Sequence, residues 1–76
     1  MKIKICPVGI LKRHIGGKEF CFLEIPTDTS VREALTTAKI PPDEVMAVSV
    51  NKEREDKDFS LSEGDEILLI PFIGGG

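Results

Sequence analysis

The first part of the chain alternates between apolar and charged residues. Over residues 1–8, Ile3 and Ile5 fall on one side of an extended segment and the neighbouring lysines on the other, which is the period of a half-buried strand. Residues 9–17 are rich in cationic side chains and glycine and predict a loop. This loop closes a hairpin onto a second predicted strand over residues 18–25.

A helix is predicted after the second strand. Ser30 and Glu33 have the spacing of a capping box, in which each side chain accepts a hydrogen bond from the backbone N–H of the other residue. We therefore expect a helix to begin at Val31, where apolar residues recur at helical spacing and form a stripe that suits packing on a sheet. The proline pair at residues 41–42 ends the helix soon after Lys39.

The second half of the chain contains two more apolar segments. Residues 45–50 predict a strand, and residues 51–58 are so highly charged that they predict a solvated turn or hairpin with a short edge element. Residues 66–73 are almost continuously apolar, as in a strand in the middle of a sheet. One face of the strand at residues 45–50 is expected to carry Met46, Val48 and Val50.

This order of elements predicts an α+β domain. Strand, strand, helix, strand, short edge element and strand follow each other as in the β-grasp (ubiquitin-like) arrangement, in which one helix crosses a mixed four- to five-stranded sheet. We expect the β-grasp domain to span residues 1–73 and a flexible glycine tail to occupy residues 74–76.

Size and charge narrow the range of functions. A chain of 76 residues forms one small domain without room for a large enclosed active site. The formal net charge of −3 argues against a nucleic-acid partner, because phosphate binding needs an excess of Lys and Arg. Acidic residues outnumber basic ones in the second half, which would attract a partner with a basic docking surface. No apolar run is long enough to span a membrane, and we expect a cytoplasmic protein without a membrane partner.

The few cysteine and histidine residues offer no set of metal ligands. Cys6, Cys21 and His14 are the only residues of their kinds. Strand alternation places Cys21 toward the core and Cys6 on the opposite face, so a disulfide cannot close and both thiols should be free. His14 is expected to be a solvated loop residue rather than a base, and the sequence identifies no carboxylate partner for it. The alternative for Cys6 is a conjugation or redox site.

Two blocks of sequence carry a family resemblance, LEIPTDTSVREAL in residues 23–35 and VMAVSVNKEREDKDFSLSEGDEILLIPFIGGG in residues 45–76. In the second block, Val-Asn at residues 50–51 precedes the charged hairpin, and an L-x-x-G-D-E turn at Leu61–Glu66 precedes an apolar strand and terminal glycines. Together these features resemble the sulfur-carrier proteins ThiS and MoaD and, more distantly, ubiquitin. Gly74 departs from the simplest pattern, because many relatives have Ala or Ser there, whereas some thiamin-branch relatives end in three glycines.

The resemblance implies a protein co-substrate rather than an enzyme. An ATP-dependent, E1-like activating enzyme would adenylate the carboxylate of Gly76, and sulfur from a donor such as a cysteine desulfurase would replace AMP to give a thiocarboxylate. The carrier would then pass its sulfur to a downstream synthase subunit that makes thiamin thiazole or molybdopterin. No cofactor would be bound permanently, since ATP is used by the activating enzyme.

The glycine tail alone is expected to bind an activating enzyme weakly, so the folded domain must contribute to binding. Gly75 and Gly76 have no Cβ to obstruct a narrow site in which the carboxylate reacts first with ATP and then with sulfur. Ordering each residue costs about 1–2 kcal/mol of backbone entropy, so the body must supply docking energy. We expect an exposed apolar strip to dock the activating enzyme, with Asp65 and Glu66 facing its basic residues. The strip would consist of Phe20, Phe22, Leu68, Ile70 and Phe72.

Two other functions remain open for this fold. In a protein modifier, the adenylated Gly76 passes to a lysine amine and forms an isopeptide bond, and a noncovalent binding module would not need Gly75 and Gly76 at all. Terminal glycines without any function are the simpler interpretation of the tail. The apolar strip also has a simpler interpretation, in which it packs against a loop or a second copy of the chain.

Overall fold

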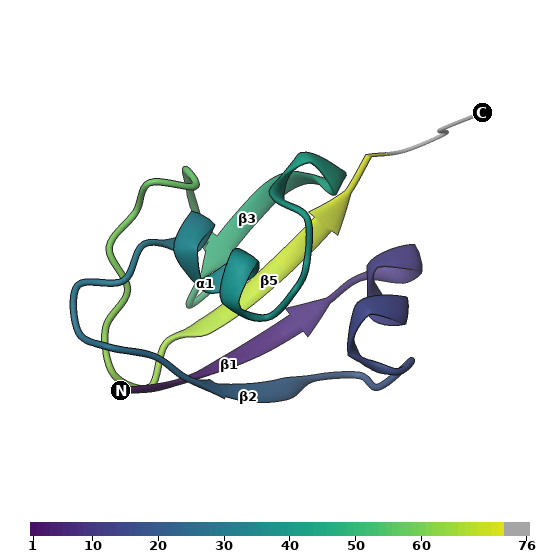
Figure 1. Cartoon of the computed structure of the whole chain (residues 1–76). Coiled ribbons are helices and arrows are strands. Elements are labelled where there is room, and N and C mark those ends of the chain that lie inside the picture. Colours follow the sequence, from purple (N-terminus) through teal and green to yellow (C-terminus); the bar gives the residue numbers. More distant parts are fainter. Residues whose placement is uncertain (73–76) are drawn as a thin grey trace.

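The computed structural model describes residues 1–72, and the expected glycine tail lies outside the described residues. The strands are β1 (Lys2–Pro7), β2 (Cys21–Glu24), β3 (Val45–Val50), β4 (Glu53–Glu55) and β5 (Glu66–Pro71). The helices are the α-helix α1 (Val31–Thr37) and two 3₁₀-helices, η1 (Gly9–Ile15) and η2 (Pro42–Glu44). The five strands form one sheet in the order β2-β1-β5-β3-β4 (Figure 1).

The strand β5 lies at the centre of the sheet, as its apolar sequence predicts. It pairs with β1 in parallel and with β3 in antiparallel fashion, and β2 and β4 form the two edges. Figure 1 shows β1 and β5 pointing in the same direction and α1 lying over one face of the sheet. A mixed sheet crossed by one α-helix in this order is the β-grasp fold, so the predicted fold class is confirmed.

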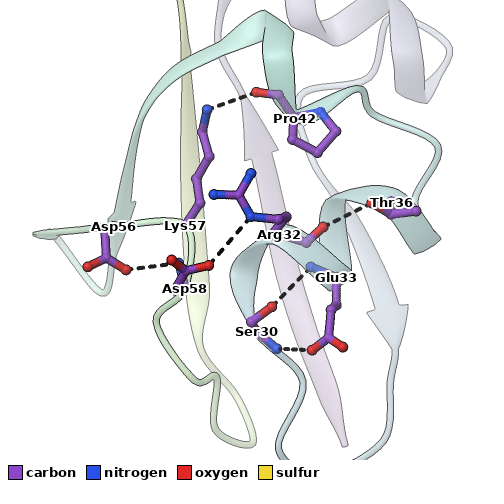
Figure 2. A network of polar contacts seen from close by, with 8 residues as sticks. All are labelled: Ser30, Arg32, Glu33, Thr36, Pro42, Asp56, Lys57 and Asp58. Carbon is purple, nitrogen blue, oxygen red and sulfur yellow. Dashed lines mark hydrogen bonds and ion pairs between the residues drawn. The ribbon is translucent and has the colours of Figure 1, made fainter.

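The helix α1 begins where the capping box predicts. Ser30 Oγ accepts a hydrogen bond from the Glu33 N–H at 3.1 Å, and the Glu33 carboxylate accepts one from the Ser30 N–H at 2.9 Å (Figure 2). The helix ends at Thr37, earlier than predicted, and Lys39 already has a left-handed φ of 64°. Both ends of this short helix are therefore set by residues close in the sequence, the first by side-chain caps and the second by the backbone conformation.

A second set of polar contacts joins the loop after β4 to the helices. Arg32 Nε of α1 lies 3.4 Å from an oxygen of Asp58, and Lys57 Nζ donates a hydrogen bond to the Pro42 carbonyl of η2 at 2.9 Å (Figure 2). The loop itself is closed by the Asp58 N–H, which donates to Asp56 Oδ1 at 2.8 Å. These contacts fix the position of the loop after β4 relative to α1 and η2.

The hydrophobic core lies between α1 and the face of the sheet that α1 covers. Its buried side chains come from β1, β3, β5 and α1, and from η1 and the turns, while Cys21 and Leu23 of β2 are partly buried against it. The largest fully buried members are Ile3, Ile5, Leu11, Leu35, Ile40, Ile67 and Leu69. Core side chains on β1 and β5 fall at alternate positions, as the sequence predicts.

The predicted loop at residues 9–17 is instead occupied by η1. Leu11 is fully buried and anchors η1 in the core, and its N–H donates to the Val8 carbonyl. Gly16 and Gly17 both have positive φ, and their N–H groups close the end of η1 on the carbonyls of the preceding turn. The prediction of a loop was wrong because a single buried side chain organises a segment that is otherwise polar.

Two predicted strands differ in detail from the observed ones. The strand β2 is shorter than residues 18–25, because pairing with β1 starts only at Cys21, opposite Ile5. Met46 was predicted to share a face with Val48 and Val50, but its side chain is 42% exposed. A register shift between Val45 and Ala47 inserts Met46 as an extra residue, which reverses the alternation at this point.

Among residues 1–72 no helix has the length and apolar character that crossing a membrane requires.

Candidate functional site

The central strand β5 carries apolar side chains on both of its faces. Ile67 and Leu69 point into the core and are 1% and 0% exposed. Leu68, which lies between them, is on the other face and is 39% exposed, and Ile70 is half-buried. The predicted alternation of β5 is confirmed, and it leaves part of the apolar surface of the sheet uncovered.

A hollow of about 350 Å³ lies on this uncovered face around Leu68. Cys6 of β1 is paired with Leu68, and Ser49 of β3 is paired with it from the other side. Lys52 and Glu66 complete the rim. The hollow therefore has a largely apolar floor, in which Ser49 is the polar member, and charged groups of both signs at its edge, which suits an apolar side chain of a protein partner.

The predicted apolar strip is divided into three parts, of which the pair of phenylalanines near β2 is the first. Phe20 and Phe22 belong to the β2 side, and their rings pack edge to face with centroids 5.6 Å apart. The strand β1 separates them from Leu68, since β2 and β5 are not neighbours in the sheet. Lys4 of β1 occupies the space between, with Nζ 4.3 Å from the centre of the Phe20 ring and 3.7 Å from Glu66. The aromatic pair and the β5 hollow are thus two surfaces, because a cation and a carboxylate lie between them.

The end of β5 forms a third exposed apolar area. Phe72 is 58% exposed and lines a shallow hollow together with residues of η1 and η2. The predicted reactive residues Gly74, Gly75 and Gly76 follow directly in the sequence but lie outside the described residues. Phe72 is therefore the described member of the predicted docking set that is nearest to the tail in sequence.

Asp65 does not present its carboxylate to a partner, which corrects the prediction for this residue. It is only 7% exposed. Its Oδ1 accepts a hydrogen bond from Asn51 Nδ2 at 2.8 Å, and its Oδ2 accepts one from the Ser62 N–H at 2.7 Å. Asn51 Oδ1 in turn accepts from the Glu66 N–H at 2.9 Å. The Val-Asn and G-D-E motifs therefore bind each other and fix the entry of the chain into β5.

Glu66, in contrast, is exposed on the uncovered face. Its carboxylate lies 3.7 Å from both Lys4 Nζ and Cys6 Sγ. Partial burial, and next the negative charge of Glu66, raise the pKa of the Cys6 thiol. Glu66 therefore stays available to a partner while it keeps Cys6 in its thiol form.

The two cysteines are free thiols on opposite faces of the sheet, as predicted. Cys21 shares the face of its pairing partner Ile5 and packs against the core. Burial raises the pKa of the Cys21 thiol as well. Neither thiol is activated as a nucleophile by these surroundings. Residues 1–72 hold no group of three or more side chains that could bind a metal ion.

His14 has a carboxylate partner that the sequence did not reveal. Its Nε2 donates to Glu44 Oε1 at 2.8 Å, and Arg13 Nη2 donates to the same oxygen at 2.8 Å. The hydrogen bond from His14, followed by the contact with Arg13, lowers the pKa of Glu44. The prediction of a solvated loop histidine was wrong, and the partner was not identifiable because Glu44 lies on η2, far away in the sequence. The one available signal was the apolar pair at residues 10–11, which indicates an anchored segment.

Comparison with known families matches this chain to the ThiS family over residues 16–76. The chain belongs to the ThiS family. Members of the family are small carrier proteins and not enzymes, and the predicted ThiS/MoaD-type resemblance is confirmed. Comparison of the sequence with curated proteins gives no match.

Solved structures share the fold of this ThiS-family chain. SAMP1 from Haloferax volcanii is 20% identical, with a TM-score of 0.76 and 100% of both chains covered. A putative molybdopterin converting factor, subunit 1, from Pyrococcus furiosus is 18% identical, with a TM-score of 0.76 and 96% of this chain and 99% of that chain covered. A complex of subunits 1 and 2 of the molybdopterin-converting factor from Helicobacter pylori contains a chain that is 21% identical, with a TM-score of 0.64 and 100% of both chains covered.

Proposed function

We propose that this ThiS-family protein is a sulfur carrier that reacts through the carboxylate of Gly76. The observation that carries the proposal is the family match, which extends over the last strand and the glycine tail to residue 76. The buried core and the uncovered apolar hollow on β5 support it, because they provide a stable body that can dock while the tail reacts.

The proposed chemistry has two steps. In the first, an oxygen of the Gly76 carboxylate attacks the α-phosphorus of ATP on an E1-like activating enzyme, and pyrophosphate leaves. In the second, the outer sulfur of a persulfide, supplied by a donor such as a cysteine desulfurase, attacks the carbonyl carbon, and AMP leaves. A thiol reductant then cleaves the S–S bond of the resulting acyl disulfide, and the products are a thiocarboxylate and a disulfide. A downstream synthase subunit takes this sulfur to make thiamin thiazole or molybdopterin.

The uncovered face of the sheet is the proposed docking surface for these partners. The hollow around Leu68 offers an apolar floor, and Glu66 and Lys52 at its rim offer charges of both signs for orientation. The Helicobacter pylori relative was solved as a complex of two subunits, which supports a protein partner for a body of this fold. A soluble activating enzyme and synthase would act on the carrier in the cytoplasm.

Intact-mass measurement tests the chemistry. The chain is incubated with ATP, a sulfur donor and the purified ATP-dependent adenylating enzyme of the same organism. We expect a mass increase equal to the exchange of one oxygen for one sulfur, and no increase when Gly76 is deleted. A persulfide on a cysteine would instead add a whole sulfur atom, and the variant Cys6→Ser with Cys21→Ser excludes it. An unchanged mass with an enzyme that adenylates another carrier would overturn the proposal.

Alkylation of the two thiols tests the docking surface. Cys6 lies in the hollow next to Leu68, whereas Cys21 lies on the covered face, so the second thiol is an internal reference within the same chain. We expect the activating enzyme to slow the reaction of Cys6 with iodoacetamide and to leave that of Cys21 unchanged. Equal rates for Cys6 with and without a bound enzyme would exclude this face as the contact.

A protein modifier is the second candidate, and the structural likeness to SAMP1, a small archaeal modifier protein, favours it. In that case the adenylated Gly76 would pass to a lysine amine and form an isopeptide bond with loss of AMP. A ladder of conjugates on a denaturing gel, lost on deletion of Gly76, would support the modifier. Free thiocarboxylate without a ladder would support the carrier.

A further inference from the structure

The end of the molecule at which β5 finishes carries three exposed apolar side chains. Ile10 of η1 is 61% exposed, Phe72 is 58% exposed and Val8 is 38% exposed. Ile10 and Phe72 line the same shallow hollow of about 280 Å³, together with Pro71. We call Val8, Ile10 and Phe72 the tail-end surface. Its apolar side chains are exposed beside a hollow and are therefore suited to burial against a partner.

The helix η1 holds the tail-end surface in a fixed position. Leu11, next to Ile10, is fully buried, and Gly9 lies beside Pro71, where an added Cβ would be at an ordinary contact distance of 3.8 Å from the proline ring. At the far end of η1, Arg13 and His14 both donate to one oxygen of Glu44 on η2. An apolar side chain that is presented on an anchored segment loses little entropy when it binds.

The length of the tail limits how far away a partner can stay. Four residues follow Phe72 in the sequence. Four residues span at most about 14 Å even when fully extended. An enzyme that encloses Gly76 must therefore approach Phe72 to within this distance, and the tail-end surface is then the part of the folded body that it meets first.

We propose that η1 is a specificity element for the activating enzyme and that Ile10 and Phe72 together receive an apolar side chain of that enzyme. The inference rests on the proposed function. It gives the activating enzyme a second contact on the carrier, separate from the hollow around Leu68. The activating enzyme is the occupant because its site must keep the acyl adenylate on Gly76 from water. Because the tail is short, an enzyme that encloses Gly76 also contacts the folded domain. The occupant is apolar where it meets the hydrocarbon of Ile10 and the ring of Phe72, which are the exposed apolar walls of the hollow. Arg13, Asp43 and Glu44 also line the hollow and offer charged groups beside this contact.

Steady-state kinetics of adenylation test this contact in the full-length chain. Exchange of labelled pyrophosphate into ATP by the purified adenylating enzyme of the same organism is measured against the concentration of carrier. We expect Ile10→Ser to raise KM about tenfold with kcat unchanged, as when a packed apolar anchor is lost from an interface. Lys12→Ala is the matched control on η1, because Lys12 pairs with Glu19 at 2.9 Å and does not line the hollow; both constants should stay unchanged.

A double variant sharpens the result. Phe72→Ser should also raise KM, and Ile10→Ser combined with Phe72→Ser should raise it by less than the product of the two single effects, because both side chains hold the same group. The thermal unfolding midpoint of each variant shows that the fold is kept, as expected for residues that are more than half exposed. Fully multiplicative effects would overturn the shared binding site.

Other outcomes separate this inference from the proposed function. If Leu68→Ser raises KM and Ile10→Ser does not, the carrier function stands and the role of η1 is wrong. If the wild-type chain supports no exchange with an active enzyme, the proposed function itself fails. If Ile10→Ser leaves KM unchanged but converts a dimer into a monomer in sedimentation, the tail-end surface binds a second copy of the chain, and the inference is overturned.

Discussion

On the central strand β5 the two faces of the sheet carry similar apolar side chains, but only one of the faces is covered. On β5, Leu69 is 0% exposed on the core face, while Leu68, its neighbour in the chain and an identical side chain, is 39% exposed on the other face. Figure 1 shows α1 over one face only. The fold thus uses one face for its own stability and leaves apolar surface on the other, which is the distribution expected of a protein that docks.

Substitution of the two leucines is the strongest test of this comparison. We expect Leu69→Ala to lower the free energy of unfolding by about 2–5 kcal/mol, because it leaves a cavity in a packed core. The same change at Leu68 should cost less than about 1 kcal/mol, because its side chain is partly solvated in the folded state. Urea denaturation measures both values. Equal losses at the two positions would mean that the outer face contributes to the core.

The neighbouring acids Asp65 and Glu66 extend the comparison to charged residues. Asp65→Ala should lower the free energy of unfolding by about 2–3 kcal/mol, because it leaves the Asn51 amide and the Ser62 N–H without their charged acceptor. Glu66→Ala, at an exposed ion pair, should cost about 0–1 kcal/mol. Denaturation of the two variants under identical conditions checks the difference, and a larger loss for Glu66→Ala would contradict the assignment of roles.

These contrasts show which parts of the fold follow from the sequence. The faces of β1 and β5 were predicted because strand alternation depends only on neighbouring residues. The start of α1 was predicted for the same reason, since Ser30 and Glu33 are three residues apart. Wherever the determining interaction is local, its pattern is visible along the chain.

Predictions failed where the determining partner lies far away in the sequence. The sequence predicts Asp65 as a surface acid because it does not show that Asn51 lies opposite it. It predicts His14 as a loop residue because it does not show that η2 brings Glu44 within hydrogen-bond distance. Met46 was misplaced because a bulge depends on the register with β5. The docking strip was divided because β1 enters between β2 and β5, which is a property of strand order.

Substitution of the N-cap of α1 tests how much the cap contributes to the helix that covers the core face of the sheet. The helix has only 7 residues and depends on its first turn. Ser30→Ala removes the oxygen that accepts the Glu33 N–H and should cost about 1 kcal/mol in chemical denaturation. Thr37→Ala, at the exposed end of the same helix, should change stability by less than about 0.5 kcal/mol. A loss at Thr37 as large as that at Ser30 would show that the cap does not set the helix.

The contact between η1 and η2 belongs to neither face of the sheet. Its loss should have the smallest effect on the free energy of unfolding, which is detected as a pH dependence. His14, and then Arg13, lower the pKa of Glu44 in the folded protein. A lowered pKa means that the folded state holds the charged form more strongly than the unfolded state does. The stabilisation is therefore present above the ordinary pKa of a glutamate and is lost as the pH falls through the lowered value.

Glu44→Gln should remove this part of the acid sensitivity. Between neutral pH and the acid end of the glutamate range, the wild-type chain should lose more stability in urea than Glu44→Gln does. Because the carboxylate is partly exposed, the difference should be smaller than the effect of Ser30→Ala. His14→Ala should reduce the same difference by removing the main donor to Glu44. Parallel pH profiles for wild type and Glu44→Gln would mean that η1 is held by Leu11 alone, and the position of the tail-end surface would then not depend on charge.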